Sequence, residues 1–184
     1  MVSESLRKSP TVLLLVDFIN PLQFPEADAL APPALAAAAA TARLKRRLAM
    51  EKVQTVYAND NYGTWHSDFH GTWRRCRALG GAPRRLAQAL MPAADDLAIL
   101  KPRHSAFFNT PLELLLGQLR TRRLVIAGLA TDMCVLFTAM DAFLRGYKLW
   151  VPSDCVAAES ERAGRDALDY MKRVLHARTA PSSR

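Results

Sequence analysis

The chain has 184 residues, of which 50% are hydrophobic and 23% charged, and this suits one folded domain, because single cores stop growing at about 250–300 residues. No apolar run approaches the roughly 18 residues needed to span a bilayer, and the N-terminus lacks a hydrophobic signal region, so we exclude a membrane protein and expect a cytoplasmic one. The formal net charge of +8 comes from arginines scattered along the chain, so we expect no nucleic-acid partner.

Short apolar runs alternate with longer helical patterns along the chain. In chain order we expect a strand over Thr11–Val16, a helix over Pro33–Met50, a strand over Val53–Ala58, helices over Trp73–Ala78 and Arg84–Leu90, a strand over Leu97–Leu100, a helix over Pro111–Leu119, a strand over Leu124–Ala127, a helix from GLATDMC to about Arg145, a strand over Lys148–Val151 and a helix over Ser160–Ala177. This alternation predicts the α/β class: a three-layer, Rossmann-like α/β/α domain with a mostly parallel sheet of five or six strands. We expect a single domain over 1–184, with frayed tails at 1–9 and 179–184.

Polar side chains directly follow each expected strand. In a parallel sheet the carboxyl ends of the strands lie at one edge, and ligands bind there. In strand order these side chains are Asp17, then Asn59 and Asp60, then Lys101 with Arg103 and His104 behind it, then Thr131 and Cys134, then Ser153 and Asp154. The pattern therefore brings a carboxylate, an ammonium and a thiol to one edge of the sheet.

Cys134 is the candidate nucleophile among the three cysteines, none of which belongs to a C-x-x-C pair. That usage argues against a disulfide framework and excludes a zinc ribbon. If Thr131 is the N-cap of the next helix, Cys134 falls in its first turn, where backbone N–H groups and the helix dipole favour a thiolate. The competing interpretation is a small buried hydrophobe, which suits Cys76 and Cys155 better.

Asp17 and Lys101 are the candidate partners of that thiol. Asp17 ends an apolar run, and as a general base it would take the cysteine proton and pass it to a leaving amine. Lys101 would keep the carboxylate ionised and stabilise the thiolate. A loop-capping aspartate and a surface lysine are the alternatives.

Four segments of the chain, in order, resemble the isochorismatase-like hydrolase family, which includes nicotinamidases, N-carbamoylsarcosine amidohydrolases and ureidoacrylate hydrolases. The segments are LLLVDFIN, VYANDNYGTWHSDF, LKPRHSAFFNTPLELLL and VIAGLATDMCVLFTAMDAFLRGYKLWVPSDCVAA. The resemblance implies a strand order of 3-2-1-4-5, an Asp17–Lys101–Cys134 triad and a thioester-type intermediate. It also implies a cis peptide between Leu129 and Ala130, an oxyanion hole made by the N–H groups of Ala130 and Cys134, and a homodimer or homotetramer.

The loop after the second expected strand departs from the nicotinamidase pattern. Nicotinamidases of this family carry a D-x-H metal motif, whereas Asp60 is followed by Asn61 and Tyr62. The NDN-x-G-x-W form resembles a metal-free branch, so we expect no cofactor; a displaced site made by Asp60, His66 and His70 is the alternative. We expect the following residues to line a substrate pocket: Asn59, Asp60, Tyr62, Trp65, Phe107 and Thr131.

The leading interpretation is a hydrolase of a small amide, carbamoyl or ureido compound that acts through Cys134. A vinyl-ether hydrolase of the isochorismatase type, which needs no thiol, is one alternative. A non-catalytic module that binds a ligand or partner protein on the same scaffold is the other. The partner expected for the leading interpretation is a small-molecule substrate.

Overall fold

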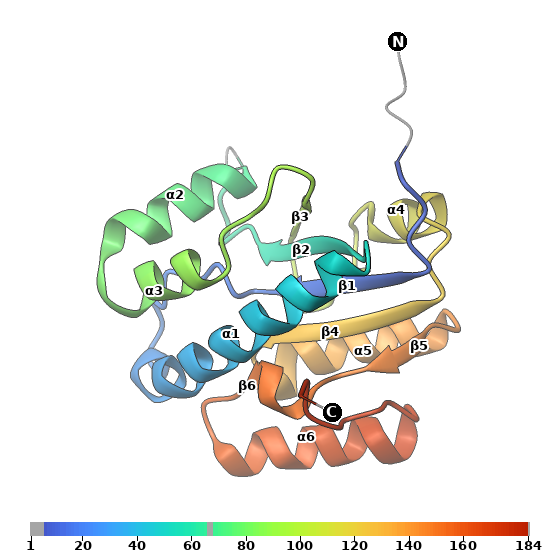
Figure 1. The fold of residues 1–184 in the computed structure, drawn as a ribbon. Coiled ribbons are helices and arrows are strands. Elements are labelled where there is room, and N and C mark those ends of the chain that lie inside the picture. Colours follow the sequence, from blue (N-terminus) through green and yellow to red (C-terminus); the bar gives the residue numbers. More distant parts are fainter. Residues whose placement is uncertain (1–5, 66–67, 184) are drawn as a thin grey trace.

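The computed structural model describes residues 6–65 and 68–183, which form a six-stranded parallel sheet (Figure 1). The strands are β1 (Thr11–Val16), β2 (Gln54–Asp60), β3 (Leu97–Lys101), β4 (Arg123–Leu129), β5 (Lys148–Trp150) and β6 (Val156–Ala157). Their order is β3-β2-β1-β4-β5, and β6 pairs with the end of β4. The expected class and strand order are thus confirmed, and β1 and β4 are neighbours at the switch point of the sheet.

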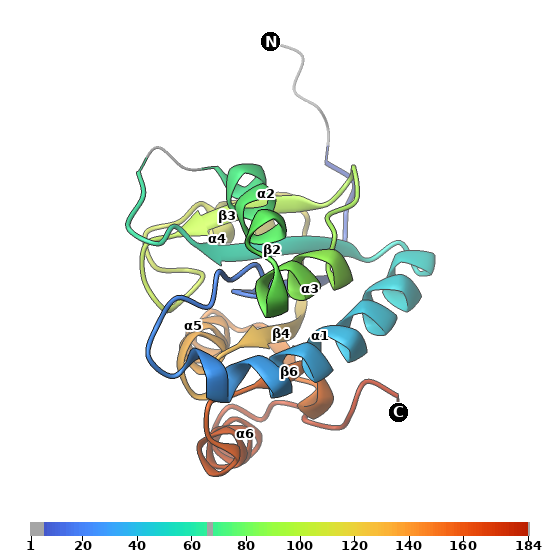
Figure 2. The same ribbon diagram turned by 90° about the vertical axis from the view of Figure 1, so that its left-hand side faces the viewer.

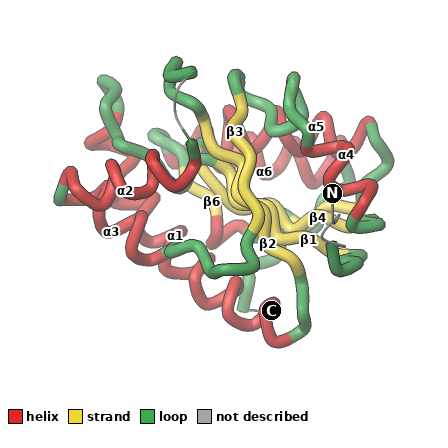
Figure 3. The backbone as a smooth tube through the Cα atoms, turned by 90° about the horizontal axis from the view of Figure 1, so that it is seen from above, coloured by secondary structure: helices red, strands yellow, loops and turns green. Residues whose placement is uncertain are grey.

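Helices cover both faces of this sheet. They are α1 (Ala27–Met50), α2 (Phe69–Leu79), α3 (Gly81–Ala89), α4 (Leu112–Gln118), α5 (Leu136–Leu144) and α6 (Glu161–Val174). Figures 2 and 3 show α1, α2 and α3 on one side of the strands and α4, α5 and α6 on the other. Among the described residues, no helix has both the length and the apolar character needed to cross a membrane.

Strand β1 explains why the sheet is covered on both sides. Its five residues from Val12 to Val16 are all essentially inaccessible to solvent. Because successive side chains of a strand point to opposite faces, Leu13 and Leu15 pack under α1 and α3, whereas Val12, Leu14 and Val16 pack under α4, α5 and α6. An apolar run without alternation therefore encodes a central strand.

Helix α1 begins six residues earlier than expected, at Ala27. The sequence placed the start at Pro33 because proline removes a backbone donor and disfavours a helical residue before it. In the structure Pro32 and Pro33 both lie inside the helix. Leu30 and Ala34 are buried against the sheet, and this tertiary packing outweighs the local preference.

Near both ends of the described chain a serine is hydrogen-bonded to the fold, while residues 1–5 and 184 of the tails predicted to fray lie outside the described residues. Ser9 is buried, and its hydroxyl accepts a hydrogen bond from the first N–H of β2. Ser182 donates from its N–H and its hydroxyl to the carboxylate of Asp154, at 2.6 and 2.7 Å. An acidic partner near the end of β5 thus fixes the C-terminal segment.

Candidate active site

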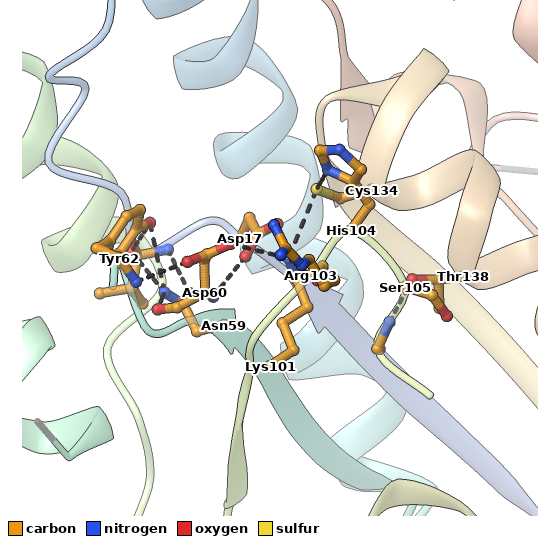
Figure 4. Close-up of polar contacts among 12 residues, drawn as sticks. Asp17, Asn59, Asp60, Tyr62, Lys101, Arg103, His104, Ser105, Cys134 and Thr138 are labelled. Atoms are coloured by element: carbon orange, nitrogen blue, oxygen red, sulfur yellow. Dashed lines mark hydrogen bonds and ion pairs between the residues drawn. The ribbon is translucent and has the colours of Figure 1, made fainter. Parts of the chain in front are cut away.

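Asp17, Lys101 and Cys134 meet at the carboxyl edge of the sheet (Figure 4). Asp17 directly follows β1, Lys101 is the last residue of β3, and Cys134 lies in the helical segment after β4. Lys101 Nζ is 2.7 Å from Asp17 Oδ2 and 3.5 Å from Cys134 Sγ. The lysine side chain is fully buried, so its charge is directed at these two partners rather than at water.

The ammonium group of Lys101 reaches Asp17 across the end of β2, which lies between β3 and β1. It also donates to the carbonyl of Arg103 at 3.1 Å and lies 3.6 Å from Asp60 Oδ2. The other oxygen of Asp17 accepts the N–H of Asp60 at 2.7 Å. Both carboxylate oxygens are therefore held, and the position of Asp17 is determined by β2 and β3.

Gly128 allows β4 to lie against the end of β1 just before Asp17. It is paired in register with Val16. A Cβ atom added to Gly128 would lie 2.2 Å from the carbonyl oxygen of Val16, a distance that would force the two strands apart. The glycine thus brings the segment that carries Cys134 close to the carboxylate.

Burial dominates the electrostatics of the three groups. It raises the pKa of Asp17, although Lys101 and hydrogen bonds pull in the opposite direction. For Lys101 burial favours the neutral amine, but the charges of Asp17 and Cys134 outweigh that effect and raise its pKa. Burial and the Asp17 charge raise the pKa of Cys134 to about 12. The thiol of the free protein therefore keeps its proton at neutral pH and needs a base, and a carboxylate with a raised pKa is a stronger base than usual.

The segment that carries Cys134 starts differently from the sequence expectation. The cap residue is Ala130 rather than Thr131, and Thr131–Val135 forms a π-helical turn that runs into α5. Thr131, which was expected to line the substrate pocket, is 1% exposed and borders a separate cavity beside α6. The peptide bond between Leu129 and Ala130 is cis.

Three further residues expected to line the substrate pocket, Asn59, Tyr62 and Phe107, make contacts within the fold, and Tyr62 also lines a smaller cavity beside α2. Asn59 exchanges two hydrogen bonds with the backbone of Ile19, at 3.2 and 2.8 Å, and the Tyr62 hydroxyl donates to the same carbonyl at 2.9 Å. Both side chains thus fix the loop that follows Asp17. Phe107 is 5% exposed and belongs to the core beneath α4 and α5.

A cavity of about 630 Å³ opens beside Lys101. Trp65 lines it, as expected, together with Arg103 and Phe108. The sequence placed Arg103 behind the third strand without assigning it to a pocket, and nothing in the pattern distinguished Phe108 from the buried phenylalanine before it. The wall also includes Leu100 and Pro102, the two residues that flank Lys101 in the chain, whereas Asp17, Lys101 and Cys134 do not line the cavity.

His104 contacts the sulfur and was not among the expected site residues. Its Nδ1 lies 3.6 Å from Cys134 Sγ, and its ring lies against that of Phe137 on α5. The signal available in the sequence was its place three residues after Lys101. The path of the intervening turn, which brings the imidazole over the thiol, could not be read from spacing.

The residues around Asp60 do not fit a metal centre. Asp60 is engaged by Lys101, and a tyrosine stands where a D-x-H motif would place histidine. The ring of His70 makes an edge-to-face contact with that of Phe69, and His66, the other histidine of the alternative site, lies outside the described residues. Over residues 6–65 and 68–183, no three His, Cys, Asp or Glu side chains are grouped so as to hold a metal ion.

The fold and the site together define the class of protein: a doubly wound α/β protein with a carboxylate, an ammonium and a thiol grouped where such sheets bind small molecules. The isochorismatase domain matches residues 11–182, and the chain belongs to the isochorismatase family.

Relatives and solved structures agree with that membership. The uncharacterized isochorismatase family protein YaaI of Bacillus subtilis is 34% identical over 94% of both chains. The ureidoacrylate amidohydrolase RutB of Cronobacter sakazakii is 41% identical over 41% of this chain, a match that spans 36% of RutB. The crystal structure of the nicotinamidase SaPncA from Staphylococcus aureus is 25% identical, with a TM-score of 0.73 over 94% of this chain and 98% of that one.

Proposed function

We propose that this protein hydrolyses the C–N bond of a small carboxamide, carbamoyl or ureido compound, with Cys134 as the nucleophile. The observation that carries the proposal is the buried Lys101 ammonium group, 2.7 Å from Asp17 and 3.5 Å from the thiol. A buried ion pair that touches a partly exposed cysteine is a costly arrangement for stability alone. Relatives named as a nicotinamidase and as a ureidoacrylate amidohydrolase support this reaction class.

The first half of the reaction forms a thioester. Asp17 accepts the thiol proton while Lys101 stabilises the developing thiolate, and the sulfur attacks the carbonyl carbon of the substrate. The N–H groups of Ala130 and Cys134, at the start of the helical segment, bind the oxyanion; one such donor is typically worth about 2.7–4 kcal/mol. Asp17 then gives its proton to the leaving nitrogen, and the C–N bond breaks.

The second half releases the product. Asp17, again ionised, takes a proton from water, and the resulting hydroxide attacks the thioester. Collapse of this intermediate returns the thiol and frees the carboxylic or carbamic acid. The cavity bounded by Trp65, Arg103 and Phe108 is the proposed site for the remainder of the substrate.

We further propose that two or four copies associate, through the surface where α4 meets α5. Leu114 and Leu144 are 66% and 77% exposed there, next to an ion pair between Glu113 and Arg145 that joins the two helices. Light scattering during size-exclusion chromatography measures the assembly. We expect Leu144→Glu to reduce it to a monomer, and a monomeric native protein would contradict the proposal.

Ammonia release from a panel of amides and ureides tests the reaction. We expect Cys134→Ala to lose at least about 10³-fold in kcat, because the covalent route disappears. Cys76→Ala is the matched control, since Cys76 is buried and its pKa is raised to about 11 by burial; it should retain activity. Turnover that survives Cys134→Ala would overturn the proposal and favour chemistry without a thiol.

A further inference from the structure

We propose that His104 is a further catalytic residue: its imidazole provides a second, solvent-facing route for the thiol proton of Cys134, as an alternative to transfer to Asp17. The inference rests on the proposed role of Cys134 as nucleophile. It adds a proton route that the Asp17–Lys101–Cys134 arrangement does not contain.

Three polar groups surround the sulfur, and they differ in what they can do. Lys101 Nζ at 3.5 Å can only donate, because an ammonium group has no lone pair. Asp17, whose charge adds to the effect of burial in raising the pKa of the thiol, lies within the protein and is 5% exposed. His104 Nδ1, at 3.6 Å, is the contact on the solvent side; it can accept the thiol proton when the imidazole carries its hydrogen on Nε2, and its side chain is exposed. Figure 4 shows the imidazole and the ammonium group on opposite sides of the sulfur.

All three N–H bonds of the Lys101 ammonium group already have acceptors. Because an ammonium group cannot accept a proton, the thiol proton must pass to another group that is a base. The three short contacts of Lys101, to Asp17, to the carbonyl of Arg103 and to the sulfur, account for its three N–H bonds. Asp17 is held on both oxygens by Lys101 and the N–H of Asp60. An imidazole that contacts the sulfur and faces water can exchange a proton without disturbing these contacts.

The position of His104 is fixed from two sides. Its ring lies 5.5 Å from that of Phe137, centroid to centroid. Phe137 is 49% exposed, and we infer that its role is to hold the imidazole in place. The next residues are attached to α5: Ser105 Oγ donates to Asp141 at 2.5 Å, and the N–H of Ala106 donates to the Thr138 hydroxyl at 3.0 Å. The imidazole is therefore held against the helix that follows Cys134.

The proton step balances without an additional reactant. On this route the S–H bond breaks and its proton passes to Nδ1 of His104 in place of Asp17, leaving a thiolate between two cations, imidazolium and ammonium. The sulfur lone pair forms the C–S bond while the carbonyl π pair moves to oxygen. When the C–N bond breaks, the imidazolium returns the proton to the leaving nitrogen. The charged groups that face this proton are Lys101 from β3, Asp17 from β1 and, behind the lysine, Asp60 from β2.

The rate of Cys134 alkylation by iodoacetamide between pH 5 and 9, read by peptide mapping, tests the inference without requiring a substrate. A cysteine–imidazole pair gives a plateau of reactivity near neutral pH, because the ion pair supplies thiolate below the pKa of the thiol itself. We expect this plateau in the native protein. In His104→Asn and His104→Phe the rate should instead rise about tenfold per pH unit, with at least a tenfold loss at pH 7.

The two substitutions separate proton transfer from positioning. Asparagine keeps a hydrogen-bonding group near the place of Nδ1 but does not titrate, whereas phenylalanine keeps only the ring that contacts Phe137. His176→Asn is the matched control, since His176 is also exposed and its ring packs against another phenylalanine of α5, Phe143; its profile should match the native one.

Two outcomes would overturn the inference. One is a native profile that coincides with those of both His104 variants. The other is a plateau that survives in His104→Asn and disappears only in His104→Phe, which would reduce His104 to a positioning residue. If the plateau depends on His104 as expected but no amide is hydrolysed, the proposed reaction is wrong. The inference that His104 exchanges a proton with Cys134 is then still supported.

Discussion

The two ends of β3 each carry a lysine–aspartate pair, part-buried at the start of the strand and buried at its end, and only the second pair contacts a reactive atom. At the start of the strand, Lys45 of α1 lies 2.5 Å from Asp96 and also donates to the Tyr57 hydroxyl at 2.9 Å and to a backbone carbonyl. At its end, Lys101 lies 2.7 Å from Asp17 and 3.5 Å from the sulfur of Cys134.

The difference lies in the partners of each ammonium group. Lys45 Nζ contacts the oxygen atoms of Asp96, Tyr57 and Met91 and lies over the Tyr57 ring, so that pair joins α1 to the sheet. Lys101 directs one donor at a thiol and lies next to a cavity. The same two residue types thus serve stability at one end of the strand and are placed for chemistry at the other, which shows that the third partner, more than the pair, marks the functional site.

Removing each lysine should separate these roles most clearly. We expect Lys101→Met to lower kcat by at least about 10³-fold, because neither the thiolate nor the oriented carboxylate survives. Lys45→Met should leave kcat within about threefold. Both substitutions should reduce the free energy of unfolding by about 3–5 kcal/mol, since each leaves a buried aspartate unpaired.

Urea unfolding and steady-state kinetics on the same samples check this prediction. The double variants Asp17→Asn/Lys101→Met and Asp96→Asn/Lys45→Met remove both charges and should recover most of the lost stability. Only the second should be active. Full activity in Lys101→Met, or an inactive but stable Lys45→Met, would show that the two pairs do not divide the roles in this way.

The pH dependence of kcat/KM should sharpen the comparison. Asp17 must be ionised to accept a proton, and burial raises its pKa, so activity should fall about tenfold per pH unit below an acid limb that lies above the ordinary aspartate value of about 3.9. Because His104 is the other proposed base at the thiol, the limb is best measured in His104→Asn. Asp96→Asn should leave the pH of the acid limb unchanged. Constant kcat/KM down to pH 4 would contradict the role of Asp17 as the general base.

The sequence predicted the reactive end of β3 better than its surroundings. Asp17, Lys101 and Cys134 each follow an apolar run, and the geometry of parallel sheets was enough to bring them to one edge. The roles of Asn59 and Tyr62 depend instead on one backbone carbonyl in a loop, which no periodicity encodes.

The same limit applies to residues whose direction depends on a turn. Thr131 faces α6 because a π-helical turn replaces the first turn of an α-helix. Phe107 enters the core, and His104 reaches the thiol, because the chain after Lys101 is attached to α5 by side-chain hydrogen bonds. Local patterns fix where strands end; they do not fix the path of the chain beyond those ends.

The smallest expected effect concerns Tyr57, the neutral partner of Lys45. Burial and the charge of Asp96 raise the pKa of Tyr57 well above its ordinary value of about 10. The folded protein therefore keeps this proton above pH 10, where the unfolded chain loses it. The stability that Tyr57 contributes is complete below pH 10 and declines by up to about 1.4 kcal/mol per pH unit above it.

Tyr57→Phe should cost about 1 kcal/mol at pH 7, because the hydroxyl gives up its hydrogen bond to the carbonyl of Leu90. The variant should also lose stability less steeply between pH 10 and 11, while kcat at pH 7 stays unchanged. Urea unfolding of both proteins at pH 7, 10 and 11 measures these differences. Parallel pH dependences would mean that the tyrosine ionises in the folded state, and a fall in kcat would mean that the two ends of β3 are coupled.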